Sequence, residues 1–292
     1  MLGTMNIHDR MIIFLVLALF LGATMEYGHG SKLLGILLFG IALLAISRMT
    51  LKATHRKTHT WYALVGILII LADIIYNVYN QSELGTLDTM TFLLGLSLIA
   101  SATKREDIRS MGEFGVYVAI TFIALFTLFY GTFEEFIHEF DHYAVLMPSM
   151  HLIKLIGISV DVIGTETVCL HAPAGDITLT IGGPCSGLYS MFLLISVIVA
   201  YTATENIKDS RKITALLIIT IVVAWIANLL RVSALYLTAY QYGNGAMMTV
   251  HTHLGWIIFV IVAWGLLLGL SKIEKMERVD RKEKRGNEKG EE

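Results

Sequence analysis

Long apolar runs are the feature that most constrains how this chain folds. A helix that crosses the hydrocarbon core of a bilayer, about 30 Å thick, needs roughly 20 mostly apolar residues. Only 16% of the 292 residues are charged, whereas soluble domains average about 25%. The sequence therefore predicts an all-α polytopic membrane protein with about eight transmembrane helices. The predicted spans are Met11–Met25, Lys32–Ser47, Trp61–Val78, Thr86–Ser101, Phe114–Tyr130, Cys185–Thr204, Ile213–Tyr240 and His251–Ser271.

Basic residues are concentrated in alternate connections between these spans. All but three of the 22 Lys and Arg residues lie before the first span, in the second, fourth and sixth connections, or after the last span. The exceptions are Lys32, Lys154 and Arg231. Because basic residues mark the cytoplasmic side, we expect both termini inside, in a multi-pass protein of the cell membrane. The net charge of −2 gives no reason to expect a nucleic-acid partner.

The predicted spans divide the chain into four regions. Residues 1–130 hold five membrane helices, 131–184 form an extracytoplasmic loop, and 185–271 form a three-helix core. Residues 272–292 are polar and mixed in charge, which predicts a disordered cytoplasmic tail. In the loop, residues 131–142 suggest a short interfacial helix. The alternating stretches VDVIGTETVCL and DITLTI, on either side of a turn-like HAPAG, predict a small outer β-hairpin.

Cys185 is the first polar group that needs an explanation. It follows Pro184 at the start of a predicted helix, where proline is favoured. Unsatisfied N–H groups at a helix N-terminus favour a thiolate, which is the nucleophilic form of cysteine. Cysteine is also an ordinary small residue of membrane helices, so this position does not decide the matter alone.

Arg231 and two histidines lie in the following spans. An arginine near the centre of a bilayer costs at least about 2.5–3.5 kcal/mol and is a functional hypothesis by default. Asn228, three residues earlier, falls on the same helix face and could hold the guanidinium in place. His251 and His253 open the last span, and their spacing directs the two rings to different sides of a helix.

These groups are expected at one depth. Counted at 1.5 Å per residue from the nearest cytoplasmic lysine of the same span, Arg231, Cys185 and His251 lie about 28, 34 and 32 Å away. Consecutive spans usually pack as neighbours. A thiol, a fixed cation and an imidazole at the outer boundary of the membrane together favour acyl-transfer chemistry.

The motifs around these residues resemble the exosortase/archaeosortase family of membrane transpeptidases. The matching pieces are the Cys-Ser-Gly of GPCSGLYSM at the start of a span, the arginine of NLLRVSALY one span later, and a histidine four residues before glycine in HTHLGW. The resemblance covers most of residues 114–271, and the archaeosortase-like branch is favoured. By this spacing the third active residue is His251, marked by Gly255, and His253 is a second candidate.

The resemblance implies a cysteine peptidase and transpeptidase of protein sorting. Its substrates would be secreted proteins with a C-terminal signal made of a short motif, a transmembrane helix and a basic cluster. The new C-terminus would pass through a thioester on Cys185 to an acceptor, which is thought to be a lipid in the archaeal branch. Arg231 would stabilise the oxyanion, and His251 would act as general acid and then base. We expect no cofactor and no metal.

Three other interpretations stay open at the level of the sequence. One is a transporter in which Arg231 binds an anion. Another is a thiol–disulfide protein that pairs Cys169 with Cys185, although no Cys-x-x-Cys spacing is present. The third is a serine peptidase that uses Ser186, although its hydroxyl is a weaker nucleophile than the neighbouring thiol of Cys185.

Overall fold

The computed structural model describes residues 60–80, 85–181, 186–204, 207 and 209–288, together with Leu37 and Ile41. The predicted spans Met11–Met25 and Lys32–Ser47 therefore lie outside the described residues, apart from Leu37 and Ile41. The elements are α3 (Thr60–Asn80), α4 (Thr86–Ser101), α5 (Glu106–Thr132), α6 (Glu134–Glu139), the π-helix η1 (Phe140–Leu146), α7 (Met147–Leu155), β1 (Val160–Val162), β2 (Thr167–Ala172), β3 (Gly175–Thr180), α8 (Leu188–Thr204) and α9 (Ser210–Glu288).

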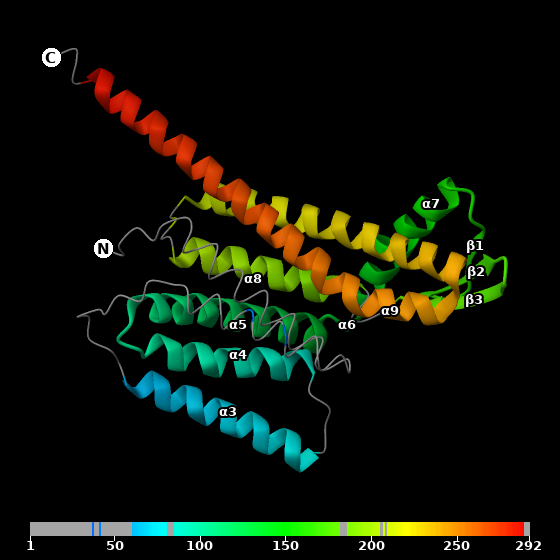
Figure 1. The fold of residues 1–292 in the computed structure, drawn as a ribbon, viewed down its shortest axis with the longest axis horizontal. Helices are drawn as coiled ribbons and strands as arrows, with labels where there is room; N and C mark the ends of the chain where they lie inside the picture. The colour runs from blue at the N-terminus through cyan, green and yellow to red at the C-terminus, as the bar shows by residue number, and fades with distance from the viewer. Residues whose placement is uncertain are drawn as a thin grey trace.

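Helices α3, α4, α5 and α8 lie side by side in chain order, and α9 packs against α8 (Figure 1). Glycines permit close approaches at these contacts. A carbon added at Gly66 of α3 would lie 2.5 Å from the main-chain oxygen of Gly95 on α4. A carbon at Gly112 of α5 would lie 2.4 Å from the nitrogen of Ser101. Small residues are typical at contacts between membrane helices, because close packing is one of the main forces that join helices in lipid.

The third to sixth predicted spans coincide with described helices. The bounds of α4 are those predicted, whereas α5 begins eight residues earlier than expected and α8 begins at Leu188. By length and composition, three described stretches can cross a membrane, namely Thr60–Asn80, Ile108–Thr132 and Ser210–Leu266, and α4 and α8 are shorter apolar helices. These helices support a membrane protein. The count of eight spans and the orientation stay predictions.

The seventh and eighth predicted spans are joined by a kink instead of the expected loop. Helical structure continues on both sides of Gly243, which alone has non-helical angles, φ 81° and ψ 177°. The apolar stretch Ser210–Leu266 has 57 residues, and as one straight helix it would be about 85 Å long, far more than a bilayer requires. After Gly243 the chain runs back past the first part of α9 (Figure 1). Glycine supplies the positive φ that this reversal needs.

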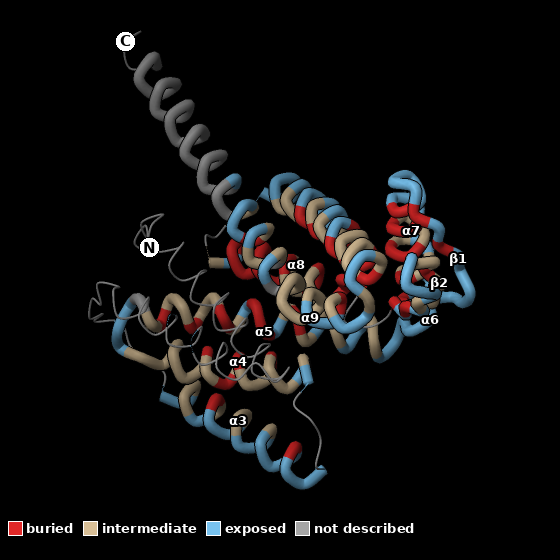
Figure 2. The backbone as a smooth tube through the Cα atoms, turned by 45° about the vertical axis from the view of Figure 1, so that its right-hand side comes forward, coloured by how far each residue is buried: buried red, intermediate tan, exposed pale blue. Residues whose placement is uncertain are grey.

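A three-stranded antiparallel sheet, in the order β1-β2-β3, follows α7. Its inner face, with Val160, Val168 and Leu170 fully buried, packs against residues of η1, α7 and α9. Figure 2 shows these buried residues at the end of the molecule away from α3. The predicted hairpin is confirmed as β2 and β3. The stretch VDVIGTETVCL was expected as one strand and is in fact two, because the chain turns at Gly164 and pairs β1 with β2.

Two polar segments differ in their agreement with the sequence analysis. The expected helix in residues 131–142 is present as α6 and the start of η1, and helical structure extends to the end of α7. The tail was expected to be disordered, but α9 continues as a helix to Glu288.

Candidate active site at the start of α8

Ser186 and Gly187 lead the chain into α8 at the end of the bundle nearest the sheet (Figure 1). Cys185, the predicted nucleophile, lies outside the described residues. Ser186 is 1% exposed, and its Oγ accepts a hydrogen bond from the main-chain nitrogen of Leu188 at 3.3 Å. Gly187 has φ 81°, a left-handed conformation that other residues rarely adopt. The chain directly after Cys185 therefore makes a sharp, buried turn.

Asn228 of α9 holds this turn. Its Nδ2 donates a 2.7 Å hydrogen bond to the main-chain oxygen of Ser186, and the residue is 7% exposed. A carbon added at Gly187 would lie 2.2 Å from the Asn228 Cγ. Gly187 therefore allows both the left-handed backbone conformation and the close approach of the Asn228 amide. From the sequence, Asn228 was predicted to hold the Arg231 guanidinium in place. Its hydrogen bond in the structure joins α9 to the segment that follows Cys185.

Arg231 is buried on α9, three residues after Asn228. A carbon added at Gly255, in the second part of α9, would lie 3.0 Å from the Arg231 Nη2 and 3.1 Å from its Cζ. The guanidinium therefore packs on the main chain at Gly255. His251 is four residues before Gly255 and on the same helix face, whereas His253 is two residues away and points to another side. Both histidines are half-buried.

These contacts connect four of the sequence-predicted positions. Ser186 contacts Asn228, Asn228 precedes Arg231 by one helical turn, and Arg231 contacts Gly255, one turn from His251. The second cysteine is not part of this group. Cys169 is a free thiol on β2, so the structure gives no support to a disulfide with Cys185. Partial burial, followed by the negative charges of Asp176 and Asp161, raises the pKa of the Cys169 thiol and opposes a reactive thiolate there.

Buried polar residues beneath this turn were missed by the sequence analysis. Asp141 of η1 is 1% exposed, and the Tyr130 hydroxyl of α5 interacts electrostatically with Asp141, Ser186 and Tyr189. The rings of Tyr130 and Tyr189 lie 5.4 Å apart. In the sequence, Asp141 is one of several acids in the segment FEEFIHEFD and nothing distinguishes it. Only the fold shows which of these carboxylates is enclosed.

Two histidines fasten the turn at Gly164 to the helical segment before the sheet. The Nδ1 of His138 lies 2.5 Å from Glu166 Oε1, and the Nδ1 of His142 lies 2.6 Å from the main-chain oxygen of Thr165. The hydrogen bond to Glu166 raises the pKa of His138. Glu166 also accepts, through its main-chain oxygen, a 2.7 Å hydrogen bond from the nitrogen of Ile181. This network positions the strand end that leads toward Cys185.

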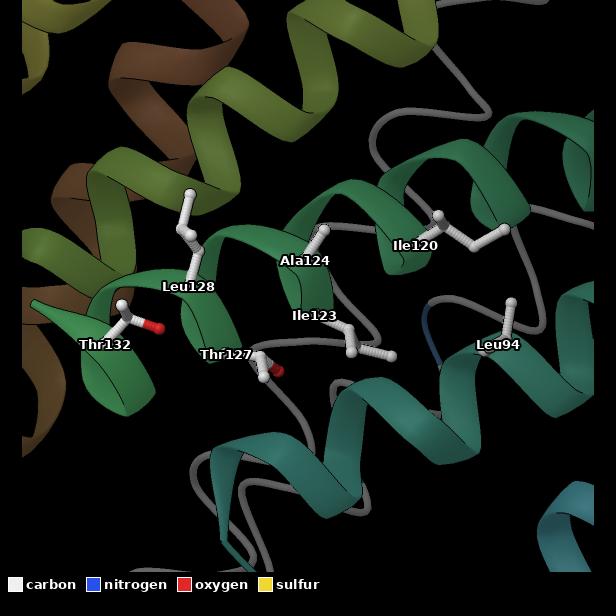
Figure 3. A pocket seen from close by; sticks show the side chains of 7 residues that line it. All are labelled: Leu94, Ile120, Ile123, Ala124, Thr127, Leu128 and Thr132. Carbon is white, nitrogen blue, oxygen red and sulfur yellow. The ribbon is translucent and has the colours of Figure 1, made fainter.

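An apolar hollow of about 560 Å³ lies elsewhere, along α5, with one lining residue from α4 (Figure 3). Its lining residues are Leu94, Ile120, Ile123, Ala124, Thr127, Leu128 and Thr132. None of these seven residues has a thiol, an imidazole or a charged group. This hollow therefore carries no chemistry of its own, and the polar junction of α8 and α9 is the better candidate for a reactive site.

Apolar helices, a buried arginine in one of them and a polar junction at the bundle end define a helical membrane protein with a candidate reactive site. Over residues 23–268 the chain matches the sequence model of the transmembrane exosortases, and it belongs to that family. Transmembrane character, protease and transpeptidase chemistry and a place in protein sorting follow from family identity. Neither the comparison with curated proteins nor that with solved structures finds a match.

The family also defines the kind of substrate. Exosortases act on secreted proteins that carry C-terminal sorting signals. The transporter interpretation of Arg231 is not favoured by this membership. The archaeosortase-like branch, the recognition motif and a lipid acceptor stay predictions.

Proposed function

We propose that the protein is a cysteine transpeptidase in which Cys185 is the nucleophile, Arg231 stabilises the oxyanion and His251 transfers protons, on the extracytoplasmic side of the membrane. The contact of Arg231 with Gly255, one helical turn from His251, carries this proposal. The hydrogen bond from Asn228 to the main chain of Ser186 supports it from the other side, because Ser186 is bonded to Cys185. A backbone turn fastened in this way is the preorganisation that acyl transfer needs.

The reaction proceeds in two halves. The Cys185 thiolate attacks the scissile carbonyl carbon, and the negative charge that develops on the carbonyl oxygen is stabilised by the Arg231 guanidinium. The carbon–nitrogen bond then breaks, and the leaving amine takes a proton from the His251 imidazolium. A thioester joins the substrate to Cys185. His251 next accepts the proton of the acceptor nucleophile, which attacks the thioester and releases Cys185 as thiolate.

The fixed charge of Arg231 suits this role. A guanidinium stays protonated throughout the cycle and presents several donors in a plane. It lies close to the main chain at Gly255, where an added carbon would push it aside by a few tenths of an ångström. Removing one oxyanion donor from comparable enzymes lowers kcat about 10²–10³-fold. Arg231→Lys, which keeps the charge but not the planar donors, is expected to lose about 100-fold.

His251 is preferred to His253 on geometric grounds. On a helix, residues four apart share a face, and residues two apart do not. His251 therefore shares the face of Gly255, against which Arg231 packs, and His253 does not. The matched pair His251→Gln and His253→Gln tests this directly, with a loss of about 10²–10⁴-fold expected for the first substitution and less than about tenfold for the second.

The test uses the full-length protein expressed with a tagged secreted protein from the same genome that ends in a short motif, an apolar helix and a basic cluster. Immunoblotting of membranes measures cut and uncut substrate. Cys185→Ala should leave only uncut substrate, whereas Ser186→Ala, which keeps the main-chain oxygen that Asn228 contacts, should still cut. Normal cutting by Cys185→Ala would exclude the nucleophile assignment. Loss with Ser186→Ala alone would favour the serine mechanism instead.

A further inference from the structure

The outward face of the three-stranded sheet carries a second cluster of chemically active side chains. Cys169 and His171 alternate with buried residues such as Val168 along β2, so both point away from the core. The register places Asp161 of β1 opposite Cys169 and Asp176 of β3 opposite His171. A thiol, an imidazole and two carboxylates therefore meet on one surface of a sheet. None of them belongs to the α8–α9 junction.

The donor atoms of this cluster are close enough to share an ion. The Cys169 Sγ, a His171 ring nitrogen and an Asp176 carboxylate oxygen all lie within 4.8 Å of one another. The Nδ1 of His171 is 2.7 Å from Asp176 Oδ1. Zinc bonds its ligands at about 2.0–2.3 Å, which sets two ligand atoms roughly 3.3–3.7 Å apart. Shifts of about 1 Å in surface side chains would complete that geometry.

We propose that Cys169, His171 and Asp176 bind one zinc ion, with water as the fourth ligand. The His171 Nδ1 coordinates the ion, and its Nε2–H donates to Asp161 Oδ2, which lies 3.0 Å away. A carboxylate that receives the second ring N–H of a metal-bound histidine fixes the tautomer and the ring orientation. The thiol proton leaves to solvent as the sulfur binds the ion. No metal was predicted from the sequence, in which these three residues show no metal-binding spacing, and they converge only when the strands pair.

The donor set selects zinc over the harder cations. Calcium and magnesium take oxygen ligands, whereas sulfur together with imidazole suits zinc. The ligands come from two adjacent strands joined by the short turn at Pro173 and Ala174, so little chain entropy is lost when they meet. Asp161 adds the third strand to the network through its hydrogen bond to His171. The cluster is on the surface, so the ion can exchange with solution.

The ion would stabilise the segment that precedes Cys185. Strand β3 ends at Thr180, and the main-chain nitrogen of the next residue, Ile181, bonds to Glu166 before the chain continues toward Cys185. A small sheet gains little stability from its own strands. A zinc ion that bridges β2 and β3 adds a covalent-like restraint to the sheet without taking part in the reaction.

Zinc binding to the purified full-length protein in detergent tests the proposal. Cys185→Ala serves as the background, so that the candidate active-site thiol cannot bind the ion. After chelator treatment, titration against a chromophoric zinc chelator should show one equivalent bound. Cobalt in place of zinc should give the near-ultraviolet band of a thiolate–cobalt bond. Cys169→Ser and Asp176→Asn should each weaken zinc binding at least tenfold, and Asp161→Asn about 10–100-fold.

His151→Gln is the matched control, because His151 is an exposed histidine of α7 outside the cluster. It should bind zinc like the background protein. Zinc should also raise the melting temperature of the background protein and not that of its Cys169→Ser derivative. Absence of a bound equivalent at micromolar zinc would overturn the proposal. Zinc binding that is weakened by neither Cys169→Ser nor Asp176→Asn would also overturn the proposal. If the Cys169→Ser variant does not fold, the zinc affinity of Asp176→Asn alone decides between the two outcomes.

Discussion

The α8–α9 junction and the outward face of the sheet both gather polar side chains, but they hold them by different means. At the junction, Asn228 and Arg231 are buried, and glycines allow them to reach the main chain of neighbouring segments. On the sheet, His171 and its two carboxylate partners are well exposed and bond to one another. Water can replace an exposed partner at little cost, whereas a buried contact has no substitute. Disturbances at the junction should therefore have the larger effects.

Among substitutions outside the proposed catalytic residues, the largest effect is expected from Gly187→Ala. Its added carbon would lie 2.2 Å from Asn228, and its φ of 81° is unfavourable for alanine. Backbone strain costs about 1–3 kcal/mol, and the overlap adds about 1–3 kcal/mol. We expect loss of substrate cutting by about 100-fold or more together with a lower melting temperature in detergent.

Gly157→Ala separates these two causes. Gly157 has φ 85°, yet nothing lies within 4 Å of an added carbon. It should show the cost of strain alone and keep most of the cutting activity. If Gly157→Ala and Gly187→Ala lose stability and activity equally, then the contact with Asn228 has no special importance. The greater sensitivity expected of the α8–α9 junction would then be contradicted.

A smaller effect, confined to catalysis, is expected from Gly255→Ala. The added carbon would lie 3.0 Å from Arg231 Nη2, so the guanidinium must shift by a few tenths of an ångström. Mispositioning of a catalytic group lowers kcat more than KM, and we expect about a tenfold loss in kcat. Gly265→Ala in the same helix has open space around the added carbon and should cut normally. Equal activity of the two variants would contradict the proposed role of the Arg231 position.

The sequence predicted the helices better than the contacts between them. Apolar length located α3, α4, α5 and α8. Arg231 stood out as a charge within an apolar span, and Asn228 stood out by its spacing from Arg231. Asp141 was missed, since burial of one acid among several depends on how η1 packs. The closeness of Cys169, His171 and Asp176 could not be predicted for a related reason, because it depends on strand register and not on spacing in the chain.

The smallest effect is expected from His138→Gln, which removes the exposed hydrogen bond between His138 and Glu166. Besides Glu166, the nearby Glu134 and Asp141 also raise the pKa of His138. A histidine with a raised folded pKa stabilises the fold fully below its unfolded pKa of 6.5. That contribution disappears as the pH rises through the raised folded value. With chelator present, wild type should therefore exceed His138→Gln in melting temperature at pH 6, and this difference should shrink toward pH 9.

The exposure of His138 keeps this difference small, because solvent screens the pair. His142→Gln removes the neighbouring contact, in which the Nδ1 of His142 lies 2.6 Å from the main-chain oxygen of Thr165. Loss of this hydrogen bond should also lower the melting temperature. A pH-independent difference between wild type and His138→Gln would show that the charge of His138 does not stabilise this turn. The contrast would then lie wholly between burial and exposure, with charge playing no part at the sheet end.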